Sequence, residues 1–199
     1  MKKGIFLAML SISGLAAAVA WSVYSAHAAT ASPNAGNVPA YTADRKLALP
    51  ANYREWVFLS SGYGMNYSTG TGSHPMFTNV FVAPEAYQGF KSSGKWPDKS
   101  MFVVEIYSPT SQGSINKSGF YQKDFMGLDV EVKDASQKNE WSYYNFNPGD
   151  KTAEVIGSGA CNSCHSEHAA VEHTFVQFYP TLLSFAEDKK LIKPGVAVR

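Results

Sequence analysis

The two cysteines of the chain, Cys161 and Cys164, are separated by two residues, and His165 follows directly. This C-x-x-C-H order is the pattern through which haem is attached to a protein. The two thiols add to the two vinyl groups of the porphyrin, and the histidine then lies under the iron as its proximal ligand. The spacing therefore predicts one covalent haem c per chain, with His165 as the metal ligand.

Three other interpretations of the cysteine pair are open. A redox pair of the thioredoxin type lies between a strand and a helix near the start of a chain, whereas this pair follows residues 157–160. A structural zinc site would use Cys161, Cys164, His168 and His173. A disulfide across two residues would be geometrically strained. We favour haem attachment.

The late position of the motif argues against a small all-helical electron-transfer cytochrome, in which C-x-x-C-H stands near the start. An electron carrier also needs a strong sixth iron ligand, usually Met or His. The candidates are Met65, Met76, Met101, Met126 and His74. Each methionine has an ordinary alternative as core filling or as a loop residue, and His74 is expected to be exposed to solvent.

The first residues are typical of an export signal. Lys2 and Lys3 precede an apolar stretch over 4–23, and residues 26–28 read Ala-His-Ala, a small-residue cleavage site. We expect a signal peptide over 1–28 and a periplasmic protein. The alternative is an uncleaved anchor, because the stretch is long enough to span a bilayer. Haem c is assembled after export, so the signal and the motif support each other.

Composition excludes several classes of protein. The 199 residues carry 17 basic and 16 acidic side chains, which gives no basic face for nucleic acid. Twelve Phe, 11 Tyr and 4 Trp can bury a real core, so the chain is not disordered throughout. We expect a mobile tail over 29–46, followed by one haem-binding domain over 47–199.

The first part of this domain has the pattern of strands. Apolar, β-branched and aromatic residues predict strands at 56–59, 77–82, 101–107 and 141–146, with a long Gly- and Ser-rich loop at 60–75. A further strand over 128–133 alternates apolar residues with Asp129, Glu131 and Lys133, which predicts one face exposed to water.

The pattern changes to a helical one after Gly159. Val171, Phe175, Phe178 and Leu182 have a 4-3-4 spacing, and Pro180 either interrupts this helix or starts a second one. The expected fold class is α+β: a mainly antiparallel sheet followed by a C-terminal helix that carries the haem-attachment motif.

At this point the chain resembles the cytochrome P-460 and cytochrome c′-beta proteins. The matching segments are residues 49–57, 79–87, 96–98, 103–105, 127–134, 161–165 and 178–180. The resemblance implies a mostly antiparallel β fold, a histidine proximal ligand and a homodimer in the periplasm. It also implies chemistry on small nitrogen oxides: hydroxylamine oxidation in the P-460 branch and nitric oxide binding in the c′-beta branch.

One position separates the two branches in this resemblance. P-460 proteins carry a lysine, cross-linked to the haem, in a strand that reads roughly aspartate, a few residues, then Lys-Glu. Alignment of Asp98 and Glu105 to that pattern places Val104 where the lysine would stand. We expect the cross-link to be absent, and we expect Lys99 and Lys117, which are near in sequence, to be solvated.

The c′-beta branch caps the distal face of the haem with phenylalanine. A strand period of two places Phe102 and Val104 on one face, and Phe77 or Phe81 of the neighbouring strand can supply a second ring. Thr78 stands about where some P-460 proteins have a distal arginine. These residues predict an open, apolar distal pocket, which would leave the iron five-coordinate.

Three functional hypotheses follow. The first is a c′-beta-like haem protein that binds nitric oxide or a related small nitrogen species. The second is a P-460-like oxidoreductase that oxidises hydroxylamine or nitric oxide. The third is a periplasmic electron-transfer cytochrome. The expected partners are a small gaseous or nitrogen-oxide ligand, a periplasmic redox partner and a second copy of the chain.

Overall fold

The computed structural model describes residues 37–65, 74–137, 139–157 and 159–198. The expected signal peptide lies outside these ranges. The elements are β1 (Leu47–Ala48), a 3-10 turn (Tyr53–Glu55), β2 (Val57–Tyr63), β3 (Phe77–Val82), α1 (Pro84–Ser93), β4 (Met101–Thr110), β5 (Tyr121–Lys133), β6 (Trp141–Phe146), β7 (Thr152–Ala153), α2 (Gly159–His168), a second 3-10 turn (Val176–Phe178) and α3 (Pro180–Asp188). No described helix is long and apolar enough to cross a membrane.

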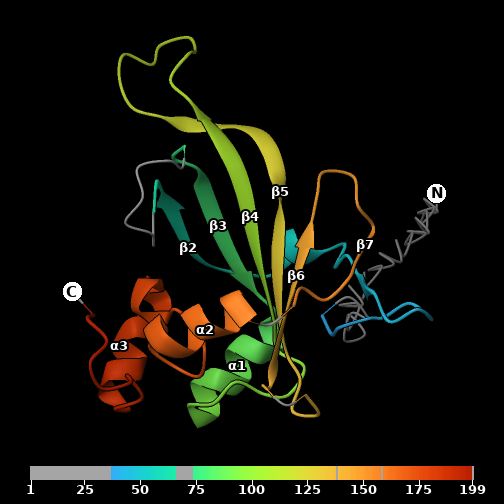
Figure 1. Cartoon of the computed structure of the whole chain (residues 1–199). Coiled ribbons are helices and arrows are strands. Elements are labelled where there is room, and N and C mark those ends of the chain that lie inside the picture. Colours follow the sequence, from blue (N-terminus) through green and yellow to red (C-terminus); the bar gives the residue numbers. More distant parts are fainter. Residues whose placement is uncertain (1–36, 66–73, 138, 158, 199) are drawn as a thin grey trace, which may run out of the picture. The chain divides into compact units, whose positions relative to one another are not determined.

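A five-stranded antiparallel sheet is the main layer of the domain. Its strand order is β2-β3-β4-β5-β6, and β1 pairs with β7 in a separate two-stranded sheet. The three α-helices lie near the end of the sheet where β4 begins, and the β4–β5 hairpin extends beyond the other end (Figure 1). This architecture confirms the predicted α+β class with a mainly antiparallel sheet.

The register defines which residues share a face of the sheet. Val80 pairs with Val104, and Val82 pairs with Phe102. Successive side chains alternate between faces, so these four residues point to the same side. Helix α3 contacts β2 and helix α2 contacts β6. Residues of α2 and of the segment before α3 share cavities with Glu131, Val80 and Val104, so they cover part of this face.

An aromatic core joins this face to the helices. The rings of Phe90 on α1 and Trp96 stack at 4.1 Å, and Trp96 meets Phe102 edge-on at 4.8 Å. Phe102 also contacts Trp141 and Tyr179. An aromatic side chain typically buries about 150–250 Å², and each favourably oriented ring pair adds roughly 1 kcal/mol. This cluster attaches α1 and the start of α3 to the centre of the sheet.

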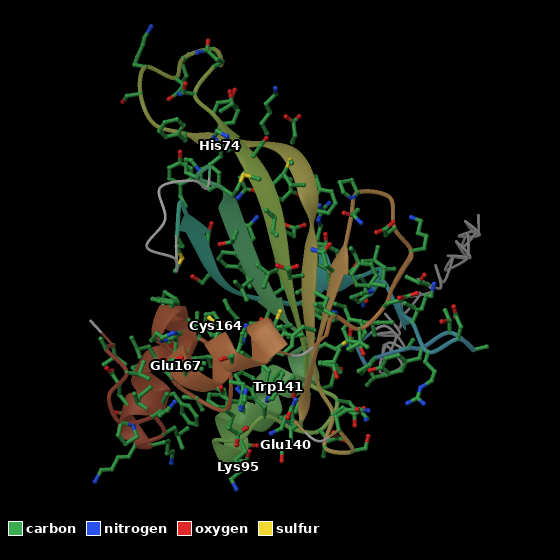
Figure 2. The ribbon with its side chains drawn as sticks, in the orientation of Figure 1. His74, Lys95, Glu140, Trp141, Cys164 and Glu167 are labelled. Atoms are coloured by element: carbon green, nitrogen blue, oxygen red, sulfur yellow. The ribbon has the colours of Figure 1, made fainter. Side chains whose placement is uncertain are left out.

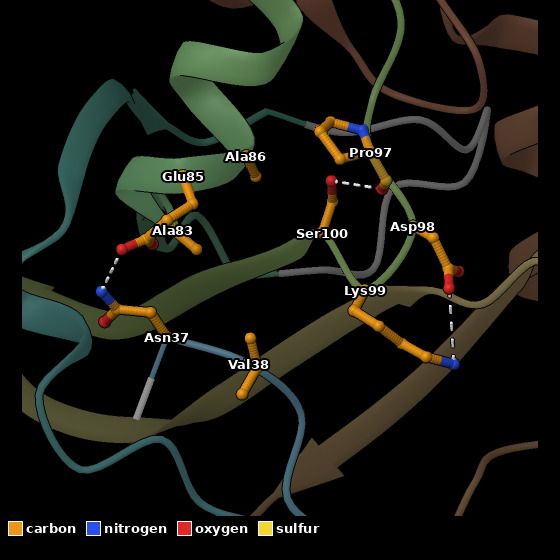
Figure 3. A pocket seen from close by; sticks show the side chains of 9 residues that line it. All are labelled: Asn37, Val38, Ala83, Glu85, Ala86, Pro97, Asp98, Lys99 and Ser100. Atoms are coloured by element: carbon orange, nitrogen blue, oxygen red, sulfur yellow. Dashed lines mark hydrogen bonds and ion pairs between the residues drawn. The ribbon is translucent and has the colours of Figure 1, made fainter. Parts of the chain in front are cut away.

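Residues 37–46 are the described part of the segment that was expected to be a mobile tail. Asn37 accepts a hydrogen bond from Trp56 Nε1 at 2.9 Å and donates one to Glu85 at 3.0 Å. Asn37 and Val38 line a small cavity between the start of α1 and residues 97–100 (Figure 3). These hydrogen bonds join Asn37 to the domain, and the mobile tail over 29–46 stays a prediction.

Two element predictions differ from the structure. The loop expected over 60–75 begins later, because β2 continues to Tyr63 through its pairing with β3; residues 66–73 lie outside the described ranges. The helical spacing from Val171 to Leu182 does not form one helix. Pro180 starts α3, as one of the two alternatives predicted, while 171–178 form a tight turn and a 3-10 turn.

Candidate functional site

Helix α2 carries the C-x-x-C-H motif. Cys161 and Cys164 are three positions apart, so they lie on the same side of the helix. Both are free thiols and half-buried. Figure 2 shows Cys164 on α2 beside the sheet. The thiols line a cavity of about 210 Å³ between α2, β5 and β6, which we call the motif cavity; its walls are Asp129, Val130, Glu131, Tyr143, Tyr144, Ile156, Cys161, Cys164 and His165.

His165 is held with one ring nitrogen bound and the other facing a carboxylate. Its Nδ1 lies 2.7 Å from the carbonyl oxygen of His173. A carbonyl only accepts, so Nδ1 carries the proton and Nε2 keeps its lone pair for a metal. The ring packs between Tyr143 at 4.8 Å and Phe175 at 4.7 Å. Burial lowers the pKa of His165, which favours the neutral, ligating form.

The end of α2 is held by side chains from later in the chain. Lys193 Nζ donates to the carbonyls of Ser166 and Glu167, at 2.6 and 3.1 Å. Gln177 Nε2 donates to the carbonyl of His168 at 2.8 Å. The last carbonyls of a helix have no partner within the helix, so these contacts satisfy them. They fix the helix that presents the thiols and the imidazole.

A second cavity of about 200 Å³, which we call the strand cavity, lies against β2–β5. Its walls are Ser60, Gly62, Met65, Thr78, Val80, Val104, Ile106, Asp129, Glu131, Phe175, Phe178 and Tyr179. Val80, Val104 and Ile106 make the wall on β3 and β4 apolar. Asp129 and Glu131 belong to both cavities, so the two spaces meet along β5.

The carboxylates of β5 correct the expectation that this face of the strand is exposed to water. The side chain of Glu131 is only 12% exposed, and its Oε1 lies 3.6 Å from His165 Nε2. Burial, with a smaller contribution from Asp129, raises the pKa of Glu131 to about 8. Burial also raises the pKa of Asp129, against a hydrogen bond from Asn145 that lowers it. The pocket is apolar on one side and acidic on another.

Only some of the predicted distal residues line the cavities. Val104 and Thr78 are walls of the strand cavity. Phe102 shares the face of Val104, as predicted, but it is 1% exposed and packs in the aromatic core. Phe77 and Phe81 point to the opposite face, where Phe77 contacts Tyr63. The structure therefore brings Val104 and Thr78 together with the carboxylates, and it places both phenylalanines of β3 elsewhere.

The candidate lysines lie in different settings. Lys99 pairs with Asp134 at 2.7 Å, and Lys117 is exposed in the β4–β5 hairpin. Neither is a wall of the two cavities. Val104 therefore stands in the strand cavity without a lysine among its described walls.

The candidate sixth ligands are also separated by the fold. Met65 lines the strand cavity. Met101 is buried in the core, whereas Met126 is exposed. Figure 2 shows His74 near the far end of the sheet, away from Cys164. Met76 is half-buried and is a wall of neither cavity, so Met65 is the candidate methionine that the fold places at the strand cavity.

The zinc interpretation finds no support in the described residues, where no group of three or more His, Cys, Asp or Glu side chains is placed to hold a metal ion. The donor set fits a haem instead. Two free thiols lie on one helical side, and one imidazole has its Nδ1 occupied. The Tyr143 hydroxyl is buried in the motif cavity without a partner among the described residues, so it has hydrogen-bonding capacity left for a bound group.

An antiparallel sheet facing a short helix with C-x-x-C-H defines a β-rich haem cytochrome. The family model for cytochrome P460 matches residues 50–176. The chain belongs to this family, which confirms the resemblance and supports a haem cofactor. No match was found among curated proteins.

Proposed function

We propose that the chain is a mono-haem c protein that binds nitric oxide or a related small nitrogen oxide. Cys161 and Cys164 would hold the haem through thioether bonds, and His165 Nε2 would bind its iron. The observation that carries the proposal is the setting of His165: its Nδ1 is bound to a backbone carbonyl, and its Nε2 faces Glu131, a wall that the motif cavity shares with the strand cavity. The haem supplies an iron centre for a small ligand when it is bound.

The residues of the chain have distinct tasks in this proposal. The carbonyl of His173 orients the imidazole, and Tyr143 and Phe175 fix the plane of its ring. Val80, Val104 and Ile106 provide an apolar wall that favours a neutral diatomic ligand over water. The absence of a lysine from the described walls supports ligand binding without a cross-link.

A second candidate function is the oxidation of hydroxylamine, and the acidic side of the cavities favours it. This reaction releases protons, which need an acceptor within hydrogen-bond reach. Glu131 and Asp129 are partly buried carboxylates that line the motif cavity with the imidazole, and a pKa of about 8 lets Glu131 exchange protons near neutral pH. The electrons would pass to a periplasmic redox partner.

We infer that the protein is exported and works in the periplasm as a homodimer. The N-terminal sequence, with two lysines before an apolar stretch and an Ala-His-Ala site, supports export. Membership of the cytochrome P460 family, in which the resemblance implies dimers, supports the second copy. Intact mass after expression with the leader should give a mature chain beginning at Ala29, and light scattering should give twice its mass.

The absorption spectrum of the reduced protein, produced in cells that assemble haem c, tests the proposal. We expect a five-coordinate, high-spin spectrum with a normally placed Soret band, and a new spectrum when nitric oxide is added. A red-shifted Soret band would indicate a cross-link and favour the enzyme. A sharp low-spin α band would favour electron transfer with Met65 as a ligand.

Covalent attachment is tested separately by mass spectrometry. The double variant Cys161→Ser, Cys164→Ser should lose the haem mass under denaturing conditions. Ser163→Ala, a change at an exposed position inside the same motif, is the matched control and should keep it. A wild-type protein without covalent haem would overturn the proposal.

A further inference from the structure

The carbonyl that holds His165 belongs to an unusual turn. Val171 and Thr174 exchange backbone hydrogen bonds of 3.2 and 2.7 Å across it. The two central residues, Glu172 and His173, have φ angles of 42° and 67°. Two consecutive non-glycine residues in the left-handed region cost conformational free energy. The turn therefore persists only if its surroundings hold it.

The ion pair between Lys133 and Glu172, which we call the clamp, holds the turn. The carboxylate oxygen Oε2 of Glu172 accepts from Lys133 Nζ at 2.9 Å and from the backbone N–H of Trp96 at 3.0 Å. Lys133 Nζ also donates to the Trp96 carbonyl at 2.9 Å, and its side chain is only 12% exposed. Charge-assisted hydrogen bonds in a shielded setting are the strong ones.

Trp96 also holds the turn on the side of Thr174. Trp96 Nε1 donates to Thr174 Oγ1 at 2.9 Å, and Thr174 Oγ1 donates to the Val171 carbonyl at 2.6 Å. Trp96 is 2% exposed and stacks on Phe90 in the aromatic core. The turn is thus tied to β5 through Lys133 and to the core through Trp96.

We propose that Lys133 and Glu172 are positioning residues for His165: they hold the His173 carbonyl against His165 Nδ1 and would thereby adjust the reduction potential of a haem bound there. This inference rests on the proposed function, in which His165 binds iron. A hydrogen bond at Nδ1 raises the basicity of the ligating nitrogen. A more basic ligand would stabilise the oxidised iron, so release of the turn would raise the reduction potential.

The experiment compares holoprotein variants whose covalent haem has been verified by mass. Glu172→Ala and Lys133→Met should each raise the reduction potential and weaken the iron–histidine stretch in the Raman spectrum. The expected shift is about tenfold in the equilibrium constant of reduction, which is about 59 mV for one electron. Lys133→Arg keeps a charged donor and should restore most of the wild-type potential.

Asp134→Ala is the matched control. This change breaks the ion pair in which Lys99 Nζ lies 2.7 Å from Asp134 Oδ1. The Asp134 side chain makes no contact with the turn among the interactions described. We expect it to lose stability without a change in potential. Wild-type potentials in Glu172→Ala and Lys133→Met, or an equal shift in Asp134→Ala, would overturn the inference.

Amide hydrogen exchange separates this inference from the proposed function. Release of the clamp should speed exchange at the Trp96 amide and across 171–174 in both variants, whatever group the protein carries. If the wild type carries no covalent haem, the proposed function fails while the exchange still shows whether the clamp fixes the turn. Unchanged exchange in both variants would contradict the clamp itself.

Discussion

The surroundings of Glu131 and Asp129 differ from the solvent exposure that their strand pattern predicts. Both alternate with apolar residues in β5, which is the pattern of a strand with one solvated face. The structure turns that face towards α2 and buries the carboxylates beside His165. A buried carboxyl favours its neutral form, so burial raises the pKa of both groups, that of Glu131 to about 8.

Replacement of Glu131 tests this at the level of one residue. If the protein oxidises hydroxylamine, Glu131→Gln should lower the rate by about 100-fold or more, because the proton acceptor is lost, and nitric oxide binding should persist. Glu154→Gln is the control, since Glu154 is exposed and pairs with Lys46. A steady-state assay with both variants makes the comparison, and equal rates would remove Glu131 from the chemistry.

The ion pair of Asp134 predicts how the stability of the protein depends on pH. Lys99, and then the Ser136 hydroxyl, lower the pKa of Asp134 to about 2. A depressed pKa means that the stabilisation is present above the unfolded pKa of about 4 and is lost as pH falls towards 2. The free energy of unfolding of the wild type should exceed that of Asp134→Asn by about 1 kcal/mol at pH 6. Urea unfolding at several pH values should show this difference shrink below pH 4 and disappear only near pH 2; a constant difference would contradict the assignment.

At the scale of elements, α2 depends on contacts from outside its own sequence. It has ten residues, and isolated helices of that length are marginal in water. Lys193 and Gln177 satisfy its terminal carbonyls, and the 171–174 turn holds the imidazole that it presents. The position of α2 therefore depends on residues that follow it in the chain.

Removal of the Lys193 contact should loosen α2. Lys193→Met loses two charge-assisted hydrogen bonds to α2, and we expect a loss of about 1–2 kcal/mol in the free energy of unfolding. Lys95→Met, at an exposed lysine after α1, is the control and should change it by less than about 0.5 kcal/mol. Chemical denaturation measures both, and faster amide exchange at 165–168 should accompany the first variant alone.

At the scale of the whole molecule, one aromatic core joins the sheet to the helices. Phe102 is in its centre, so Phe102→Ala should cost about 3–5 kcal/mol through lost contacts and the remaining cavity. Phe120→Ala, in the exposed β4–β5 hairpin, should cost far less. Urea unfolding of the purified proteins measures the free energy of unfolding of both variants. Similar losses in the two would contradict the assignment of Phe102 to the centre of the core.

Sequence alone determined the chemistry that is local in the chain. The order Cys161, Cys164, His165 predicts haem attachment because two thiols and a ligand must lie within five residues. Most strands were predictable, since β-branched and aromatic residues at period two favour a pleated surface. The end of β2 and the turn at 171–174 were not, because pairing with β3 and the Lys133–Glu172 clamp involve residues far apart in sequence.

Tertiary structure decided which residues surround the site. Alternation along a strand assigns two faces but does not say which one another element will cover. The helices cover the face with Asp129, Glu131 and Val104, which leaves Phe77 and Phe81 on the other side. The acidic half of the pocket exists only because α2 returns over β5, and that return is a property of packing rather than of any short segment.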